Sequence, residues 1–315
     1  MKAVLVGGGG FVGINLALRL AGNMENSVYV VSRHFSRISN LSAHENISQI
    51  PAELLQFSKY RHALKDADVV FHLASSIIPG RSNIDIPNEL TDISASAALF
   101  EKCIESGVKR LVFLSSGGAI YGSNAEHPTE CSQTFPISSY GIQKLAIERL
   151  LYLYSYTHHL DYRIVRLSNP YGPYQDPNRG LGVISTFIYD AVNNKDLTVL
   201  GDGSVVRDFI YIDDAIDGIL AISEYDGNHR IFNLGTGHGI SIRKVAELVV
   251  NHTQTDSVVR YRDGRTVDVP RNVLDTSLIR RETGFVPKTS LGRGIELTAE
   301  FFRKISKAGY GGESK

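Results

Sequence analysis

Residues 2–13 read KAVLVGGGGFVG, an apolar run that passes directly into glycines at positions 7, 10 and 13. A strand, a glycine-rich turn and a helix in this order form the phosphate-binding unit of dinucleotide-binding sheets. Glycines let the backbone approach a pyrophosphate, and the free N–H groups of the helix favour its charge. We therefore expect Gly7, Gly10, Phe11, Val12 and Gly13 to bind a dinucleotide, although four glycines could also form a merely flexible turn.

Further apolar runs without polar alternation follow along the first half of the chain. They are Val28–Val31, Val69–Leu73, Leu111–Leu114 and Arg163–Leu167. Such runs suit strands that are buried on both faces of a parallel sheet. Helical patterns separate them, at Phe11–Ala21, Ile93–Ser106 and Ser139–Tyr156. The repeated alternation predicts an α/β fold with a doubly wound parallel sheet of the Rossmann type.

The sequence pattern changes after Pro170, where loops rich in Gly, Pro and Asn alternate with shorter helical patterns. These patterns cover residues 183–193, 213–222, 241–250 and 291–307. We expect a dinucleotide-binding Rossmann domain over residues 1–170, to which the chain returns around 209–237. Residues 171–315 are expected to form mainly a smaller C-terminal α/β substrate-binding domain.

Composition limits the classes of partner. Lys plus Arg equals Asp plus Glu at 33 each, so no overall field favours nucleic acid or an anionic membrane. Cys103 and Cys131 lack CxxC spacing, which fits a reducing compartment and predicts neither a disulfide framework nor a metal site. The first strand begins at Lys2, and no apolar run is long enough to span a bilayer. We expect a cytoplasmic protein.

The residues after the second strand bear on the choice of cofactor. An acidic residue there binds the ribose 2′-hydroxyl of NAD, whereas a nearby arginine suits the 2′-phosphate of NADP. This chain has Ser32 and Arg33, which favours NADP. The alternative is that Arg33 belongs to a solvated basic loop, since arginines are common on protein surfaces.

A tyrosine and a lysine lie one helical turn apart in the segment SSYGIQK, residues 138–144. Serines suit the start of a helix, and the spacing i, i+4 puts Tyr140 and Lys144 on one face. A phenol is a poor base near neutral pH, but an adjacent ammonium group and an oxidised nicotinamide both favour the phenolate. Tyr140 is thus a candidate proton acceptor, although a surface tyrosine with a helical lysine is the simpler alternative.

With these motifs the chain resembles the extended short-chain dehydrogenase/reductases, in the branch of nucleotide-sugar epimerases, dehydratases and reductases that includes UDP-galactose 4-epimerase. The resemblance covers nearly the whole length. Besides the glycine motif and Tyr140–Lys144, it is carried by His72–Ser75, Arg166–Pro173, Gly201–Asp214 and Asn233–Gly237.

The resemblance implies further roles. Ala74 and Ser75 would line the dinucleotide, and Lys144 would also bind the nicotinamide ribose. Asn169 and Arg207 match positions that contact the diphosphate of a sugar nucleotide. Arg265 and Asp268 match a pair that binds the diphosphate and the nucleotide ribose. The helix that carries Tyr140 pairs two subunits in relatives, which implies a homodimer.

The family pattern is broken in the segment LSSGGAIYG, residues 114–122, because the usual catalytic Ser or Thr corresponds to Gly117. Ser116 is the nearest substitute: the glycines would let the loop settle so that Ser116, or else Ser115, contacts the sugar, and Gly117 is also expected in the substrate site. Otherwise Tyr140 works alone. Sugar dehydratases carry an Asp-Glu pair just after that hydroxyl, and Gly118-Ala119 stands there instead. Dehydration is therefore not expected.

Cofactor contacts depart from the pattern as well. Ser32 replaces the usual Asp, Asp92 replaces the usual Asn, and no clear Asp follows the expected third strand near Ile47.

Three functions stay open at this point. The leading one is reversible 4-epimerisation of a nucleotide-diphospho-sugar through a transient 4-keto sugar, with bound NAD or NADP. The second is NADPH-dependent reduction of a 4-keto sugar nucleotide, which uses the same residues and is favoured by Arg33. The third is a catalytically weak dinucleotide-sensing or scaffold protein, suggested by Gly117.

Overall fold

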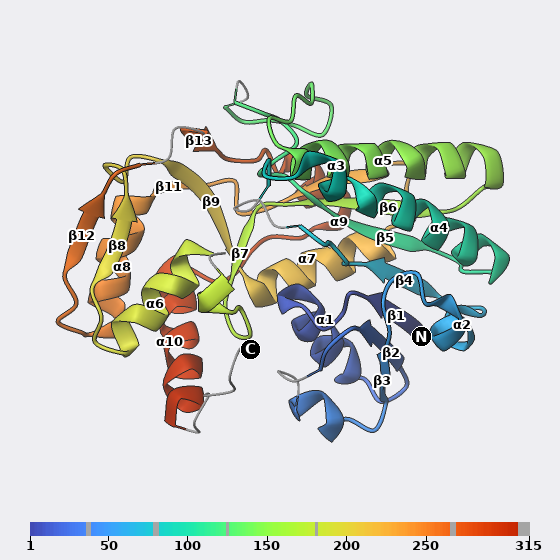
Figure 1. Ribbon diagram of the computed structural model, residues 1–315, viewed down its shortest axis with the longest axis horizontal. Coiled ribbons are helices and arrows are strands. Elements are labelled where there is room, and N and C mark those ends of the chain that lie inside the picture. The colour runs from blue at the N-terminus through green and yellow to red at the C-terminus, as the bar shows by residue number, and fades with distance from the viewer. Residues whose placement is uncertain (36–38, 78–81, 124–125, 180–181, 265–268, 308–315) are drawn as a thin grey trace.

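A fully parallel sheet of seven strands organises the described residues of the computed structural model, in the order β10-β6-β5-β4-β1-β2-β3 (Figure 1). The structure describes residues 1–35, 39–77, 82–123, 126–179, 182–264 and 269–307. The strands are β1 (Lys2–Val6), β2 (Ser27–Ser32), β3 (Ile47–Pro51), β4 (Val69–His72), β5 (Leu111–Ser116), β6 (Tyr162–Leu167) and β10 (Ile231–Leu234). The prediction of a doubly wound parallel sheet is confirmed.

Both faces of this sheet are covered by helices. One face carries α1 (Phe11–Ala21), α7 (Ile212–Glu224) and α9 (Ser277–Thr283), and the other carries α2 (Phe57–Leu64), α4 (Thr91–Glu105) and α5 (Ser139–His158). Strand β1 shows why its sequence is apolar from Ala3 to Val6: Ala3 and Leu5 enter the first core, whereas Val4 and Val6 enter the second. Side chains of a strand alternate between faces, so a sheet covered on both needs an uninterrupted apolar run.

The strand order reverses beside β1, which pairs with β2 on one side and β4 on the other. Val6 aligns with Val31 of β2 and with His72 of β4, so the carboxyl ends of these strands lie at one edge. In open α/β sheets ligands bind outside the carboxyl ends of the strands at such a reversal.

Most of the elements after residue 170 form a second group beside the sheet, at the left of Figure 1. Helices α6 (Val183–Val192), α8 (Ile242–Thr253) and α10 (Leu291–Lys307) pack together. A four-stranded sheet contains β7 (Asn169–Tyr171), β9 (Val206–Tyr211), β11 (Gly239–Ser241) and β13 (Arg271–Asn272), and a two-stranded sheet contains β8 (Leu197–Leu200) and β12 (Val259–Arg262). The short helices η1 (Ser39–Ala43), α3 (Ile86–Glu89) and η3 (Pro177–Arg179) lie in connections.

Among the described elements that follow residue 170, β10 belongs to the seven-stranded sheet, and α7 and α9 cover one of its faces. Strand β10 pairs with β6, and helix α7 packs against β6, β10 and α1. Helix α7 and strand β10 lie within residues 209–237, where the chain is expected to return to the Rossmann domain. The domain boundary at residue 170 itself stays a prediction.

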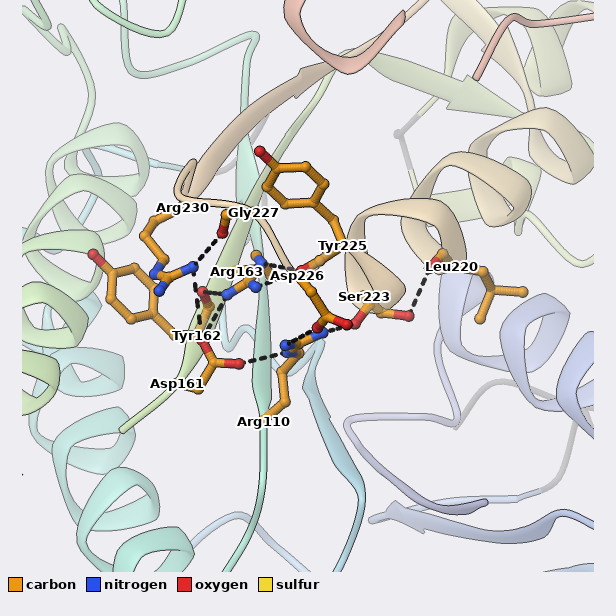
Figure 2. A network of polar contacts seen from close by, with 10 residues as sticks. All are labelled: Arg110, Asp161, Tyr162, Arg163, Leu220, Ser223, Tyr225, Asp226, Gly227 and Arg230. Carbon is orange, nitrogen blue, oxygen red and sulfur yellow. Dashed lines mark hydrogen bonds and ion pairs between the residues drawn. The ribbon is translucent and has the colours of Figure 1, made fainter. Parts of the chain in front are cut away.

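A polar network closes the amino ends of β5 and β6 (Figure 2). Asp161 accepts hydrogen bonds from Arg110 Nε and from Arg163 Nη1, both at 2.6 Å. Arg110 also reaches Asp226 at 2.8 Å, and the fully buried Arg163 donates to Tyr225 O. Each guanidinium thus has a carboxylate or carbonyl partner, as burial of charge requires. The network lies at the edge opposite the ligand-binding one, so we assign it a structural role.

Candidate active site

A cavity of about 1330 Å³ runs along the carboxyl ends of the strands and reaches the second group of elements. It exceeds the roughly 300–1,000 Å³ of an ordinary ligand pocket. The residues predicted for the cofactor all line it: Gly7, Gly10, Phe11, Val12, Gly13, Ser32, Arg33, Ala74, Ser75, Tyr140 and Lys144. Ser116, Asn169 and Arg207, predicted for the substrate, line it too. The space suits two ligands side by side.

The glycine turn forms a cradle at one end of the cavity. Gly7 has a left-handed φ of 85°, and a Cβ there would lie 2.5 Å from Ala74 N, so a larger residue would push the turn off the segment after β4. At Gly10, by contrast, a Cβ would meet only Gly7 O at 3.6 Å and would project into open space.

Helix α1 begins at this cradle. Its first bond runs from Ile14 N to Gly10 O at 2.9 Å, and no described side chain caps its N-terminus. The amides of its first turn are thus left for a ligand, and the helix dipole favours an anion. This arrangement fits the pyrophosphate of NAD or NADP.

The end of β2 forms the rim of the cavity near the cradle. Ser32 donates its hydroxyl to His34 O at 3.1 Å, so this hydrogen is already used within the chain. Arg33 is exposed. Glu53, two residues beyond β3, also lines the cavity; the sequence predicts no clear Asp after that strand, and a glutamate lies there. Its position just past the end of a strand is the sequence feature that could have identified it as a cofactor-site residue.

Three polar groups predicted for catalysis meet at the start of α5. Ser138 caps this helix by accepting from Gly141 N at 3.1 Å, which places Tyr140 in the first turn and Lys144 in the second. The phenol of Tyr140 faces Ser116, the last residue of β5, closely enough for the serine hydroxyl to lower the pKa of the phenol. The buried Lys144 Nζ donates to Leu114 O at 2.9 Å and lies 5.8 Å from the centroid of the Tyr140 ring.

Burial sets the protonation states of this group. It raises the pKa of Tyr140 to about 12, while the hydroxyl of Ser116 acts in the opposite direction. Burial also lowers the pKa of Lys144 to about 8, against the influence of Asp92 and Glu148. Near neutral pH the phenol is therefore protonated and the lysine carries its charge. A further positive charge is needed before Tyr140 can act as a base.

Gly117 lies apart from this group. It is buried, does not line the cavity, and donates its amide to Leu167 O at 2.9 Å. A Cβ on Gly117 would overlap Leu274 Cδ1 and lie 3.0 Å from Arg166 O. The space beside Gly117 is thus filled from the C-terminal part of the chain, and the described hydroxyl that faces Tyr140 is that of Ser116.

A buried ion pair links helix α5 to strand β6. Arg166 Nη2 lies 2.7 Å from Glu148 Oε2, and both side chains are almost fully buried. Ser115 donates to Glu148 Oε1 at 2.6 Å, and Arg166 donates to Tyr121 OH at 2.9 Å. Glu148 was not among the residues predicted for the site, although it follows Lys144 at the same i, i+4 spacing.

The substrate-side residues come from the short strands. Asn169 in β7 donates to Asp208 O at 2.9 Å, and Arg207 in β9 donates to Val269 O at 2.6 Å. Arg265 and Asp268 lie outside the described residues. Among the described residues, no group of His, Cys, Asp or Glu side chains is arranged to hold a metal ion. In the same part of the chain no helix is long and apolar enough to cross a membrane.

Fold and site together define a dinucleotide-dependent enzyme that moves a proton at a hydroxyl or carbonyl group. A family model described as the NAD dependent epimerase/dehydratase family matches residues 3–235. The chain belongs to this family.

Individual relatives match nearly end to end. The UDP-glucose 4-epimerase of Mycolicibacterium smegmatis is 30% identical over 98% of this chain and 100% of its own. The crystal structure of Thermotoga maritima UDP-glucose 4-epimerase with UDP-glucose has a TM-score of 0.90 at 33% identity, covering 97% and 100% of the two chains. Bacillus cereus UDP-glucuronic acid 4-epimerase, in complex with UDP-glucuronic acid and NAD, has a TM-score of 0.88 at 25% identity, with coverage of 97% and 100%.

Proposed function

We propose that the protein is a nucleotide-diphospho-sugar 4-epimerase. The observation that carries the proposal is the contact of Tyr140 with Ser116 above the buried Lys144, in one cavity with the glycine cradle. The relatives reported above are 4-epimerases that match this chain over their whole length, and the two with solved structures share its fold. We expect Asn169, Arg207, Arg265 and Asp268 to bind the diphosphate and ribose of the substrate.

The residues of this chain would handle the proton at carbon 4 of the sugar. When bound, the nicotinamide supplies a reversible hydride acceptor and a positive charge. Tyr140 takes the proton of the 4-hydroxyl and later returns it, while Ser116 holds the phenol oxygen in place. The Lys144 ammonium group favours the phenolate. Gly118 and Ala119 offer no acid and base for dehydration, so the sugar keeps all its oxygen atoms.

A second function, NADPH-dependent reduction of a 4-keto sugar nucleotide, is favoured by the position of Arg33 on the cavity rim. An exposed guanidinium there suits a 2′-phosphate. Glu53 lines the same cavity and favours NAD, because its negative charge would repel the 2′-phosphate of NADP. An epimerase retains its cofactor through both hydride transfers, whereas a reductase exchanges it at every turnover.

Two measurements test the proposal. The dinucleotide released on denaturation is identified by mass spectrometry, and NMR follows interconversion of a panel of UDP-sugars. Stoichiometric NAD with interconversion supports the epimerase. An empty protein that prefers NADPH and reduces a 4-keto sugar establishes the reductase, and no turnover with any sugar nucleotide leaves the sensing or scaffold function. Tyr140→Phe should abolish turnover with the dinucleotide still bound, whereas Tyr156→Phe, at an exposed position of the same helix, should not.

We also propose a cytoplasmic homodimer. The outer surface of α5 exposes large apolar side chains, among them Ile142, Leu153 and Tyr156, with 48%, 50% and 77% of their surface accessible. Pairing of this helix with its copy would bury them. Light scattering should give twice the chain mass at micromolar concentration, and Leu153→Asp should give the monomer. A monomeric parent protein would contradict this.

A further inference from the structure

Asp92 joins two parts of the active site through one oxygen atom. It lies in the first turn of α4 and lines the cavity. Its Oδ2 accepts hydrogen bonds from Ser76 N at 2.7 Å, from Gln143 Nε2 at 2.9 Å and from Ser75 Oγ at 3.3 Å. Ser75 and Ser76 follow β4 on the cofactor side, and Gln143 lies on α5 directly before Lys144. The carboxylate therefore fixes the catalytic helix relative to the cofactor segment.

The negative charge of Asp92 also acts on Lys144, where it favours the protonated amine. Four titratable groups face this lysine: Asp92 from α4, Glu148 and Tyr140 from α5, and His72 from β4. Burial lowers the pKa of His72 to about 3, so this imidazole is neutral. Glu148 is already paired with Arg166. Asp92 is the remaining carboxylate of this set, and no arginine is within ion-pair distance of it among the described residues.

We propose that Asp92 is a positioning residue of the proposed epimerase, which holds α5 against the cofactor segment and supplies the countercharge that keeps Lys144 protonated. The charge and the hydrogen bonds can be separated experimentally. All three donors meet the same oxygen, so the carbonyl of an asparagine can accept from each of them while the charge is lost. Asp92→Asn thus removes the charge, whereas Asp92→Ala removes the hydrogen bonds as well.

The first test needs neither substrate nor turnover. Urea denaturation is compared for the parent, Asp92→Asn, Lys144→Met and the double variant. The pKa of Lys144 lies below its ordinary value, so the folded protein loses this proton as the pH rises through about 8. At about pH 7 Asp92→Asn should lower the denaturation midpoint only while Lys144 is present, and at about pH 10 this dependence should disappear. Equal effects in both backgrounds at about pH 7 would overturn the proposal.

The second test uses turnover and so rests on the proposed function. A nearby carboxylate stabilises the protonated forms of both Tyr140 and Lys144. Both limbs of the pH profile of kcat should therefore move to lower pH in Asp92→Asn, whereas a merely structural role would lower kcat without moving them. Glu105→Gln, at the far end of α4, should leave both limbs in place. Unmoved limbs in Asp92→Asn would overturn the proposal. Coupling in urea without epimerisation would overturn the proposed function alone.

Discussion

The packing around Gly117 predicts a large difference between two neighbouring glycines. In Gly117→Ala the new Cβ would overlap Leu274 Cδ1 and stand 3.0 Å from both Leu274 Cδ2 and Arg166 O. Leu274 is fully buried beside Ile120 and Tyr121, so it cannot turn into solvent. Overpacking of this kind costs about 1–3 kcal/mol. In Gly118→Ala the nearest described atom would be Ser116 Oγ at 3.9 Å.

Scanning calorimetry measures the difference directly. Each kcal/mol shifts Tm by about 2–4 °C in domains of 150–250 residues, so Gly117→Ala should melt about 2–6 °C below the parent if this longer chain follows the lower slope. Gly118→Ala should melt at the parent temperature or slightly above, because it reduces the entropy of the unfolded chain. In a Leu274→Ala background, Gly117→Ala should lower Tm by less than it does in the parent, because the new Cβ then meets no leucine methyl groups. Equal Tm values for the two glycine variants would refute this account of the site.

Three further variants probe the same region and the opposite edge of the sheet. Ser116→Ala should lower kcat roughly 10²-fold through its contact with Tyr140 and leave Tm unchanged; full activity would mean that Tyr140 works alone. Glu148→Gln should cost about 3–5 kcal/mol in urea, since Arg166 would keep a buried, uncompensated charge; a loss below 1 kcal/mol would contradict that. Burial raises the pKa of Asp161, but hydrogen bonds from two arginines outweigh it and lower the pKa below its ordinary value. The Asp161 carboxylate therefore stabilises the folded protein near neutral pH, and this contribution is lost as the pH falls through that pKa. Asp161→Asn should be less stable than the parent at about pH 7, with the difference shrinking below about pH 3.9, and a constant difference would exclude this role.

The parts of the fold that follow from local pattern were predictable. Helix α1 begins and ends at the predicted residues, because a helical apolar pattern and the glycine on each side of it can both be read from one short stretch of sequence. The short strands β7, β11 and β13, each of two or three residues, were not predicted. Their pairing with β9 depends on partners far away in the chain. Strands so short carry too few side chains for a period to be read.

The candidate site divides in the same way. The Tyr140–Lys144 spacing is a property of one helix and could be read directly. That Ser116 reaches Tyr140 depends on how β5 ends beside α5, so the sequence alone left two alternatives open. Asp92 was noted only as a departure from the family pattern. Its three donors come from two other segments, and only the packing of α4 against α5 brings them together.

The loop after β5 is completed by residues from the other end of the chain. Leu274 fills the space beside Gly117, and Asn272 Nδ2 donates to Gly117 O at 3.3 Å. Asp275 N bonds to Pro128 O at 3.1 Å, further along the same connection. The strand order places Ser116 at the carboxyl ends of the strands of the Rossmann sheet. The loop that follows Ser116 is held in place by the segment around β13. The geometry of the candidate site therefore depends on the docking of the C-terminal elements, and the Rossmann residues by themselves do not define it.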